Sequence, residues 1–84
     1  MYLAKIYVQL KKDVLDAQGK AAKKALESSG FQMVKDVKIG KEIRIILDED
    51  DKEIASEKVK QMCESLLVNH VMEDYDFDIV EVKK

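Results

Sequence analysis

The most restrictive feature of this sequence is a period-two alternation of apolar and polar residues near both of its ends. In the first such segment, Tyr2–Leu10, four apolar residues fall on one side: Ala4, Ile6, Val8 and Leu10. In the last segment, three apolar residues alternate with aspartates: Tyr75, Phe77 and Ile79. A strand with one buried face has this period. The pattern therefore predicts a strand at each of these positions.

Two stretches between these strands have the features of helices. In the first, Asp16 can cap the helix through its carboxylate, and Gly30 can end it in the left-handed conformation. Its modest apolar stripe consists of Ala21, Ala22, Ala25 and Leu26. In the second, Asp50 and Glu53 resemble a capping box. The apolar residues that follow have the strongest helical period in the chain: Ala55, Val59, Met62, Cys63 and Leu66.

Two β-rich runs, Val34–Ile39 and Ile43–Leu47, are separated by Gly40, Lys41 and Glu42. Glycine suits a tight hairpin turn, because it adopts a positive φ without steric cost. The element order is then βαββαβ, with no linker, repeat or proline. Right-handed crossovers fold this order into one α+β, ferredoxin-like domain over residues 1–84. We expect a four-stranded antiparallel sheet with two helices on one face.

The sheet face opposite the helices is expected to be unusually apolar. It would carry five apolar residues among its charges: Leu3, Tyr7, Ile46, Val80 and Val82. Scattered apolar surface residues are normal, but five on one small face favour an interface. A chain of this size also buries only about 60% of its unfolded surface, so association is a common way to gain stability. We therefore expect the chain to self-associate through this face.

Charge and composition narrow the class of protein further. Residues 1–47 carry ten Lys/Arg and five Asp/Glu, whereas residues 48–84 carry five and twelve. The overall acidic balance and the missing aromatic-bearing RNP pattern argue against nucleic-acid binding. No amino-terminal signal sequence and no apolar run near about 18 residues is recognisable. The single cysteine cannot form an internal disulfide. We expect a cytoplasmic protein that binds neither nucleic acid nor membrane.

The sequence offers little material for catalysis. Cys63 falls on the apolar stripe of the second helix, where a thiol acts as a small hydrophobe rather than a nucleophile. His70 lies in a connection, with no adjacent Ser or Cys to activate. The acids at 48–51 are better explained by helix capping than by cation binding, since the Ca²⁺-loop pattern is absent. The lysines at 11–24 lack a phosphate-binding glycine loop, and Arg44 is the only arginine. The residues alone therefore predict a non-enzyme.

Three polar motifs nevertheless lie at element boundaries. Asp16-Ala17-Gln18-Gly19 opens the first helix, Gly40-Lys41 lies between the β-rich runs, and Asn69 precedes Glu73-Asp74-Tyr75. In order and spacing these motifs resemble those of the PurS family, the small subunit of phosphoribosylformylglycinamidine synthase. The resemblance covers nearly the whole chain.

The sequence departs from the family pattern at three positions. Ala17 and His70 stand where the family usually has proline, and Lys38 stands where arginine is frequent. Loss of the two prolines loosens the local backbone restraint. The polar groups of the motifs remain in place.

The resemblance implies a non-catalytic subunit of a glutamine-dependent enzyme of purine biosynthesis. Family members assemble with a synthetase subunit and a glutaminase subunit, which use ATP, Mg²⁺ and glutamine, while the small subunit holds no cofactor. The small subunit is expected to form a homodimer or homotetramer, to join these partners and to support ammonia transfer between them. The residues expected to contact the partners are those of the motifs: Asp16, Gln18, Gly19, Lys41, Asn69, Asp74 and Tyr75.

A second class of function fits the same βαββαβ frame. ACT-like regulatory domains bind small molecules and often place a glycine-bearing loop between the first strand and the first helix, and Gly19 lies near that position. Fold alone does not separate an assembly subunit from such a sensor. Titration with amino acids and nucleotides would separate them.

Overall fold

A three-stranded antiparallel sheet forms the centre of the computed structural model, which describes residues 1–83. Its strands are β1 (Tyr2–Leu10), β2 (Lys41–Leu47) and β3 (Glu73–Glu81), in the order β2-β1-β3. Because β1 is central, each of its residues through Val8 has a partner on both sides. The period-two segments at the two ends of the chain are therefore confirmed as strands, and they pair with each other.

One helix, α2 (Lys52–Met62), covers one face of this sheet. Ala4 and Ile6 of β1 are completely enclosed, and Ile6 packs in one cluster with Val59 of α2 and with Cys63. The inward residues of the two outer strands are only half-buried: Ile43, Ile45, Leu47, Tyr75, Phe77 and Ile79. A single helix thus buries the central strand well and the outer strands poorly.

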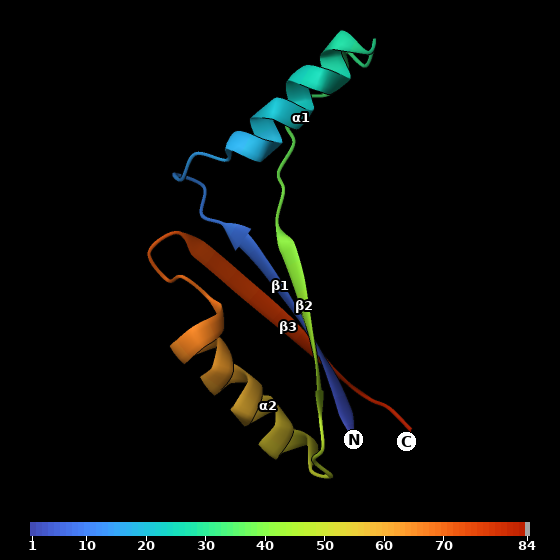
Figure 1. Cartoon of the computed structure of the whole chain (residues 1–84), viewed down its shortest axis with the longest axis vertical. Helices are drawn as coiled ribbons and strands as arrows, with labels where there is room; N and C mark the ends of the chain where they lie inside the picture. The colour runs from blue at the N-terminus through green and yellow to red at the C-terminus, as the bar shows by residue number, and fades with distance from the viewer. Residues whose placement is uncertain (84) are drawn as a thin grey trace.

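The expected four-stranded sheet with both helices on one face is not found within one chain. Residues 34–39 form no strand among the described residues; they run on into β2 as one extended segment instead of folding back as a hairpin. The other helix, α1 (Ala17–Ser28), lies beyond the end of the sheet (Figure 1). Residues 11–40 thus form an arm that consists of α1 and the segment returning beside it. The molecule measures 49 × 29 × 14 Å as a result.

The ends of α1 follow the sequence expectations. Asp16 is the N-cap, with its carboxylate accepting a hydrogen bond from the Gly19 N–H. At the other end Gly30 has a φ of 100°, and the Phe31 N–H donates to the carbonyl of Leu26. This is the Schellman arrangement, which requires a left-handed residue and so favours glycine.

The cap of α2 lies one residue later than the sequence analysis placed it. The Asp51 carboxylate accepts hydrogen bonds from the N–H groups of Glu53 and Ile54, and Asp51, not Asp50, is the N-cap. The carbonyl of Asp50 instead accepts from the Tyr2 hydroxyl at 3.4 Å. Because residues 48–51 are four consecutive acids, the sequence alone does not show which of them caps the helix.

A π-helical turn, η1 (Cys63–Leu67), ends α2 and changes which leucine enters the core. The Val68 N–H donates to the carbonyl of Cys63, five residues back. This wider turn rotates the following residues relative to a regular helix. Leu67 consequently packs against the core, whereas Leu66, expected on the buried stripe, is 84% exposed.

The two leucines of this turn should differ in their contributions to stability. We expect Leu67→Ala to lower the free energy of unfolding by about 2 kcal/mol, because it removes part of a packed side chain. Leu66→Ala should change it by no more than about 0.5 kcal/mol. Urea denaturation followed by circular dichroism measures both. Equal losses, or a larger loss for Leu66→Ala, would contradict the π-helical register.

Candidate partner-binding site

Asp16 ties together the two halves of the arm where they leave the sheet. One carboxylate oxygen, Oδ1, accepts from the Gly19 N–H at 2.8 Å, and the other, Oδ2, accepts from the Ile39 N–H at 2.9 Å. These backbone hydrogen bonds, that of Ile39 first, hold the pKa of Asp16 below its ordinary value. Asp16 is therefore a clamp between α1 and the returning segment, as well as a helix cap.

Gly19 allows these two halves to approach closely. A Cβ at this position would lie 2.3 Å from the carbonyl oxygen of Val37 and 2.5 Å from Asp16 Oδ2. Gly40 is similarly confined, because a Cβ there would lie 2.5 Å from the carbonyl oxygen of Val8. Both glycines thus have a structural reason, namely close backbone approach, where a side chain would push the segments apart.

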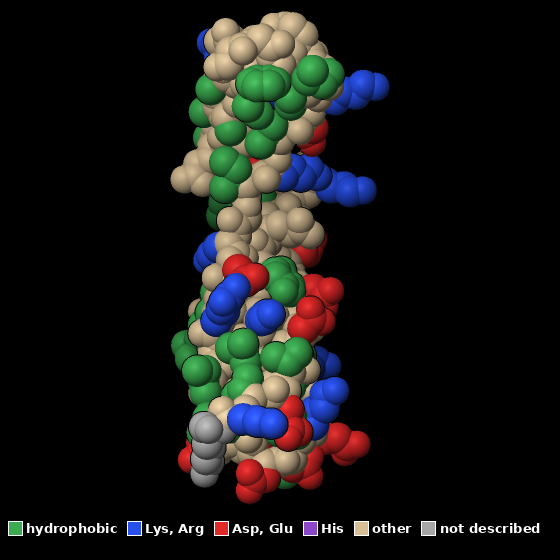
Figure 2. Space-filling view, turned by 90° about the vertical axis from the view of Figure 1, so that its right-hand side faces the viewer, with side chains coloured by type: hydrophobic (Ala, Val, Ile, Leu, Met, Phe, Trp, Pro, Cys, Tyr) green, Lys and Arg blue, Asp and Glu red, His purple; other side chains and the backbone are tan. Residues whose placement is uncertain are grey.

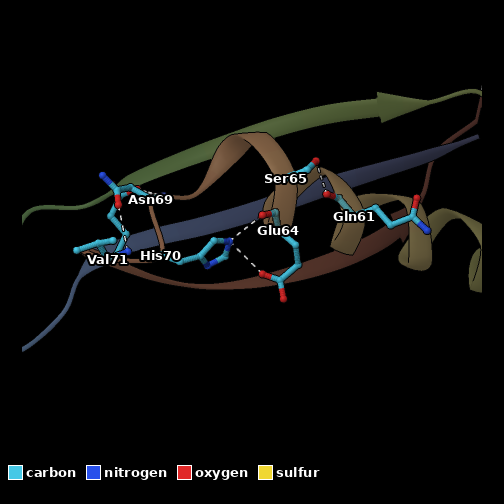
Figure 3. A network of polar contacts seen from close by, with 7 residues as sticks. Gln61, Glu64, Ser65, Asn69, His70 and Val71 are labelled. Carbon is cyan, nitrogen blue, oxygen red and sulfur yellow. Dashed lines mark hydrogen bonds and ion pairs between the residues drawn. The ribbon is translucent and has the colours of Figure 1, made fainter.

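A second polar group connects the start of β2 to the turn before β3. The Lys41 ammonium lies 3.6 Å from Glu73 Oε2, while Glu73 Oε1 accepts from the Asn69 N–H at 2.9 Å. Asn69 Oδ1 in turn accepts from the Val71 N–H at 3.1 Å (Figure 3). Asn69 therefore shapes this turn, and Glu73 joins two motifs that are distant in the sequence. Glu73 was not among the expected contacts, although its place four residues after Asn69 within a motif was a usable signal.

His70 and Tyr75 pack beside the end of the π-helical turn. His70 Nε2 lies 3.0 Å from the Glu64 carbonyl oxygen and 3.1 Å from Glu64 Oε2 (Figure 3). The Tyr75 ring meets the His70 ring edge-on at 6.3 Å and stacks on Phe77 at 6.4 Å between centroids. Burial raises the pKa of Tyr75. Tyr75 is thus largely a packing residue, and His70 is a surface residue paired with Glu64.

Two clefts lie where the arm meets the sheet. The larger, about 400 Å³, is lined by Leu10–Asp16, Lys20 and residues 36–39. The other, about 280 Å³, has Asp16 and Gln18 on one wall and Lys41 and Glu73 on the other. The structure therefore brings the first two motifs together in one cleft, here called the waist cleft: Val8–Leu10, Asp16–Gln18, Ile39–Lys41 and Glu73.

The third motif divides between two faces of β3. Tyr75 lies on the face that α2 covers, whereas Asp74 is exposed on the opposite face, opposite Gln9 of β1. Of the seven expected contacts, Asp16, Gly19, Asn69 and Tyr75 are engaged in holding the backbone or the core. Gln18, Lys41 and Asp74 have exposed polar side chains.

Cys63 has the surroundings of a core residue. It is fully enclosed, in the cluster that contains Ile6 and Val59, and burial raises the pKa of its thiol. A thiolate nucleophile requires the opposite shift. Residues 1–83 contain no group of three or more His, Cys, Asp or Glu side chains arranged to hold a metal ion. They also contain no helix long and apolar enough to cross a bilayer.

The apolar residues of the open sheet face are less contiguous than the sequence indicated. Leu3, Ile46 and Val80 lie side by side in one row, as their register requires. Tyr7 lies two rows away, beyond the charged row of Lys5, Arg44 and Asp78. Val82 lies just past β3, where its N–H donates to the carbonyl of Met1. The apolar patch is therefore confined to one end of this face.

Comparison with known proteins identifies the family. The PurS family model, described as phosphoribosylformylglycinamidine (FGAM) synthase, matches residues 3–81. The chain belongs to the PurS family. The PurS subunit of Bacillus subtilis FGAM synthase is 45% identical over 82 residues, which cover 98% of this chain and 96% of that protein. The Methanocaldococcus jannaschii PurS crystal structure superposes with a TM-score of 0.89 at 38% identity, covering 99% and 100% of the two chains.

A further PurS relative is found within a multi-subunit structure. A chain of PurLQS from Thermotoga maritima superposes with a TM-score of 0.83 at 32% identity. The match covers 95% of this chain and 99% of that chain. The superpositions therefore include both the arm and the sheet of this chain.

The Asp16 clamp should make stability dependent on pH. Because its pKa is lowered in the folded chain, its contribution is present above the ordinary aspartate value of 3.8 and is lost as the pH falls through the lower folded value. We expect Asp16→Asn to reduce the melting temperature at neutral pH, and this difference to shrink as the solution is acidified below about pH 4. Thermal unfolding at a series of pH values measures it. Asp13→Asn, an exposed neighbour, is the control; a difference independent of pH would contradict the clamp.

Proposed function

We propose that this chain is a non-catalytic assembly subunit of FGAM synthase, which joins the synthetase and glutaminase subunits and supports ammonia transfer between them. The observation that carries the proposal is the full-length match to a chain of the PurLQS structure. Cys63, the one cysteine of the chain, lies enclosed in the core cluster as a packing residue. ATP, Mg²⁺ and glutamine are then used by the partner subunits, in the cytoplasm, and this chain holds no cofactor.

The waist cleft and the neighbouring start of β3 are the proposed contact surface for the partners. Gln18 and Lys41 face solvent at the cleft, and Asp74 is exposed at the start of β3. Polar side chains at the rim of an interface set its specificity and its register. Asp16, Gly19 and Asn69 would act indirectly, by fixing the backbone that carries these side chains.

The chain also associates with itself in this proposal, as a homodimer or homotetramer. A sheet whose outer strands are half-buried under one helix leaves apolar surface that a second copy can cover. Neither nucleic acid nor membrane is a partner. The alternative of an ACT-like regulatory domain is not favoured, since the family model and the matched relatives are all PurS proteins.

Omission of the chain from a reconstituted complex should affect the two nitrogen sources differently. We expect glutamine-dependent FGAM formation to be lost, while ammonia-dependent formation by the synthetase largely persists, because free ammonia bypasses transfer between subunits. Steady-state assays with glutamine or with ammonium chloride measure both. Comparable loss with both nitrogen sources would contradict the transfer role.

Variants of the exposed motif residues test the contact surface. Gln18→Ala and Asp74→Lys should each raise the concentration of this chain needed for half-maximal glutamine-dependent activity by about tenfold, or 1.4 kcal/mol. Glu57→Lys, a charge reversal on the exposed surface of α2, should not. Circular dichroism establishes that each variant is folded. Folded variants that assemble and turn over like the parent would remove these residues from the interface.

A further inference from the structure

The proposed contact surface leaves the larger of the two clefts at the base of the arm unassigned. This cleft, here called the arm cleft, has a volume of about 400 Å³. The connection from β1 to α1 and residues 36–39 of the returning segment both line it. Pockets that hold small organic molecules measure about 300–1,000 Å³. The arm cleft is therefore large enough to hold such a molecule.

Four lysines line the arm cleft, although they come from three separate parts of the chain. They are Lys11 and Lys12 of the connection, Lys20 of α1 and Lys38 of the returning segment. None of the ion pairs within residues 1–83 involves any of these lysines. Charges of one sign along a cleft raise the local concentration of oppositely charged ligands. The cleft lysines are therefore available to an anion.

Three aspartates also line the arm cleft, but the backbone already engages two of them. Both carboxylate oxygens of Asp16 accept backbone hydrogen bonds, and Asp36 Oδ1 accepts one from the Val37 N–H at 3.0 Å. Asp13, the third, is exposed on the connection. Lysines thus outnumber aspartates in the lining by four to three, and two of the three aspartates are held by N–H groups. This balance favours an anionic ligand.

Apolar side chains lie among these charges in the lining: Leu10, Val14, Leu15, Val37 and Ile39. Leu15 is 65% exposed, and Val14 and Val37 are half-buried. On the face drawn in Figure 2, lysine side chains project from the arm beside an apolar area. An inorganic ion gains nothing from contact with apolar side chains, whereas the organic part of a larger anion does. The lining therefore favours an anion that also carries an apolar group.

The placement of the cleft lysines favours a small ligand over a macromolecule. A nucleic-acid-binding surface carries its basic residues along one face or one helix. In this chain lysines from three segments instead line a single cleft. Lysine binds phosphate as a point charge, without the fixed fork geometry of arginine. Several such charges in one cleft suit a ligand with more than one phosphate group.

We propose that the arm cleft binds a small organic polyphosphate, of the class of the nucleoside diphosphates and triphosphates. The cleft lysines contact its phosphate oxygens, and Val14, Leu15 and Val37 contact its base. The bound molecule joins the connection to the returning segment beside the Asp16 clamp, so it stabilises the folded arm by mass action. The proposal goes beyond the assembly role and does not rest on it.

Isothermal titration of the isolated chain at low ionic strength tests the site with three probes: ADP, pyrophosphate and a polyglutamate peptide. We expect one ADP to bind per chain, and pyrophosphate to bind about tenfold more weakly because it lacks the base. The peptide should bind more weakly still, and added sodium chloride should weaken ADP binding by screening the lysines. No binding of ADP, or pyrophosphate bound as tightly as ADP, would overturn the proposal. A peptide bound more tightly than ADP would indicate a protein-docking surface and would also overturn it.

Matched alanine variants place the ligand in the arm cleft. Lys20→Ala and Lys38→Ala should each weaken ADP binding by about fivefold, because each removes a charged contact to phosphate. The controls are Lys24→Ala, on the same helix, and Lys35→Ala, on the same segment; both lysines are exposed and neither lines the cleft. Circular dichroism establishes that each variant is folded. Equal weakening by the controls would show that ADP responds only to overall charge, and would overturn the site. Because the isolated chain is titrated, that result would leave the assembly role standing.

Discussion

A sheet of three strands is too wide for a single helix to cover, and most of the structure follows from this limit. Neighbouring strands lie about 4.8 Å apart, while a helix with its side chains is about 10 Å across. Helix α2 sits over β1 and encloses Ile6 completely, but Ile45 and Phe77 on either side remain half-buried. Apolar side chains are therefore fully buried only at the centre of the sheet. Its edges, and the arm that leaves the sheet, keep apolar surface exposed.

The family motifs mainly hold the backbone. Asp16 and Gly19 bring α1 and the returning segment together, and Asn69 with Glu73 shapes the turn before β3. Such residues need no exposure to a partner to be indispensable, since a displaced segment carries its exposed neighbours with it. Gln18, Lys41 and Asp74 depend on them in this way. The polar motifs of this chain thus have a structural reason in the backbone segments that they hold together.

The sequence predicts best where a single local rule decides the structure. The alternation in Tyr2–Leu10, the cap at Asp16 and the left-handed Gly30 were all predicted from neighbouring residues and are confirmed. The prediction that Leu66 is buried was wrong, because no local sequence pattern marks the extra residue of a π-helical turn. The turn is instead decided by the packing of Leu67 and Val68 against the core.

Residues 34–39 show a different limit of sequence reasoning. Their composition is that of a strand, yet a strand requires an edge to pair with, and within one chain Gly40 does not turn them back onto β2. Local propensity therefore identified the right conformation, which is extended, without identifying the pairing. The site was predictable to a similar degree, since the sequence identified the motifs but not the role of each residue. Only the folded chain shows that Asn69 supports a turn, whereas Asp74 has an exposed side chain.

The waist cleft also has a consequence for the symmetry of a complete complex. In the proposed homodimer a two-fold axis would present every surface twice, so the wall formed by Gln18 and Lys41 would occur in two identical copies. A synthetase and a glutaminase are two different proteins, and they have no reason to share that axis. A symmetric adaptor of this kind would offer the same cleft twice, to two copies of one partner, to both partners, or to one partner with the other cleft left unoccupied. In the proposed homodimer the number of small subunits per complex would therefore be even, whatever the number of the larger ones.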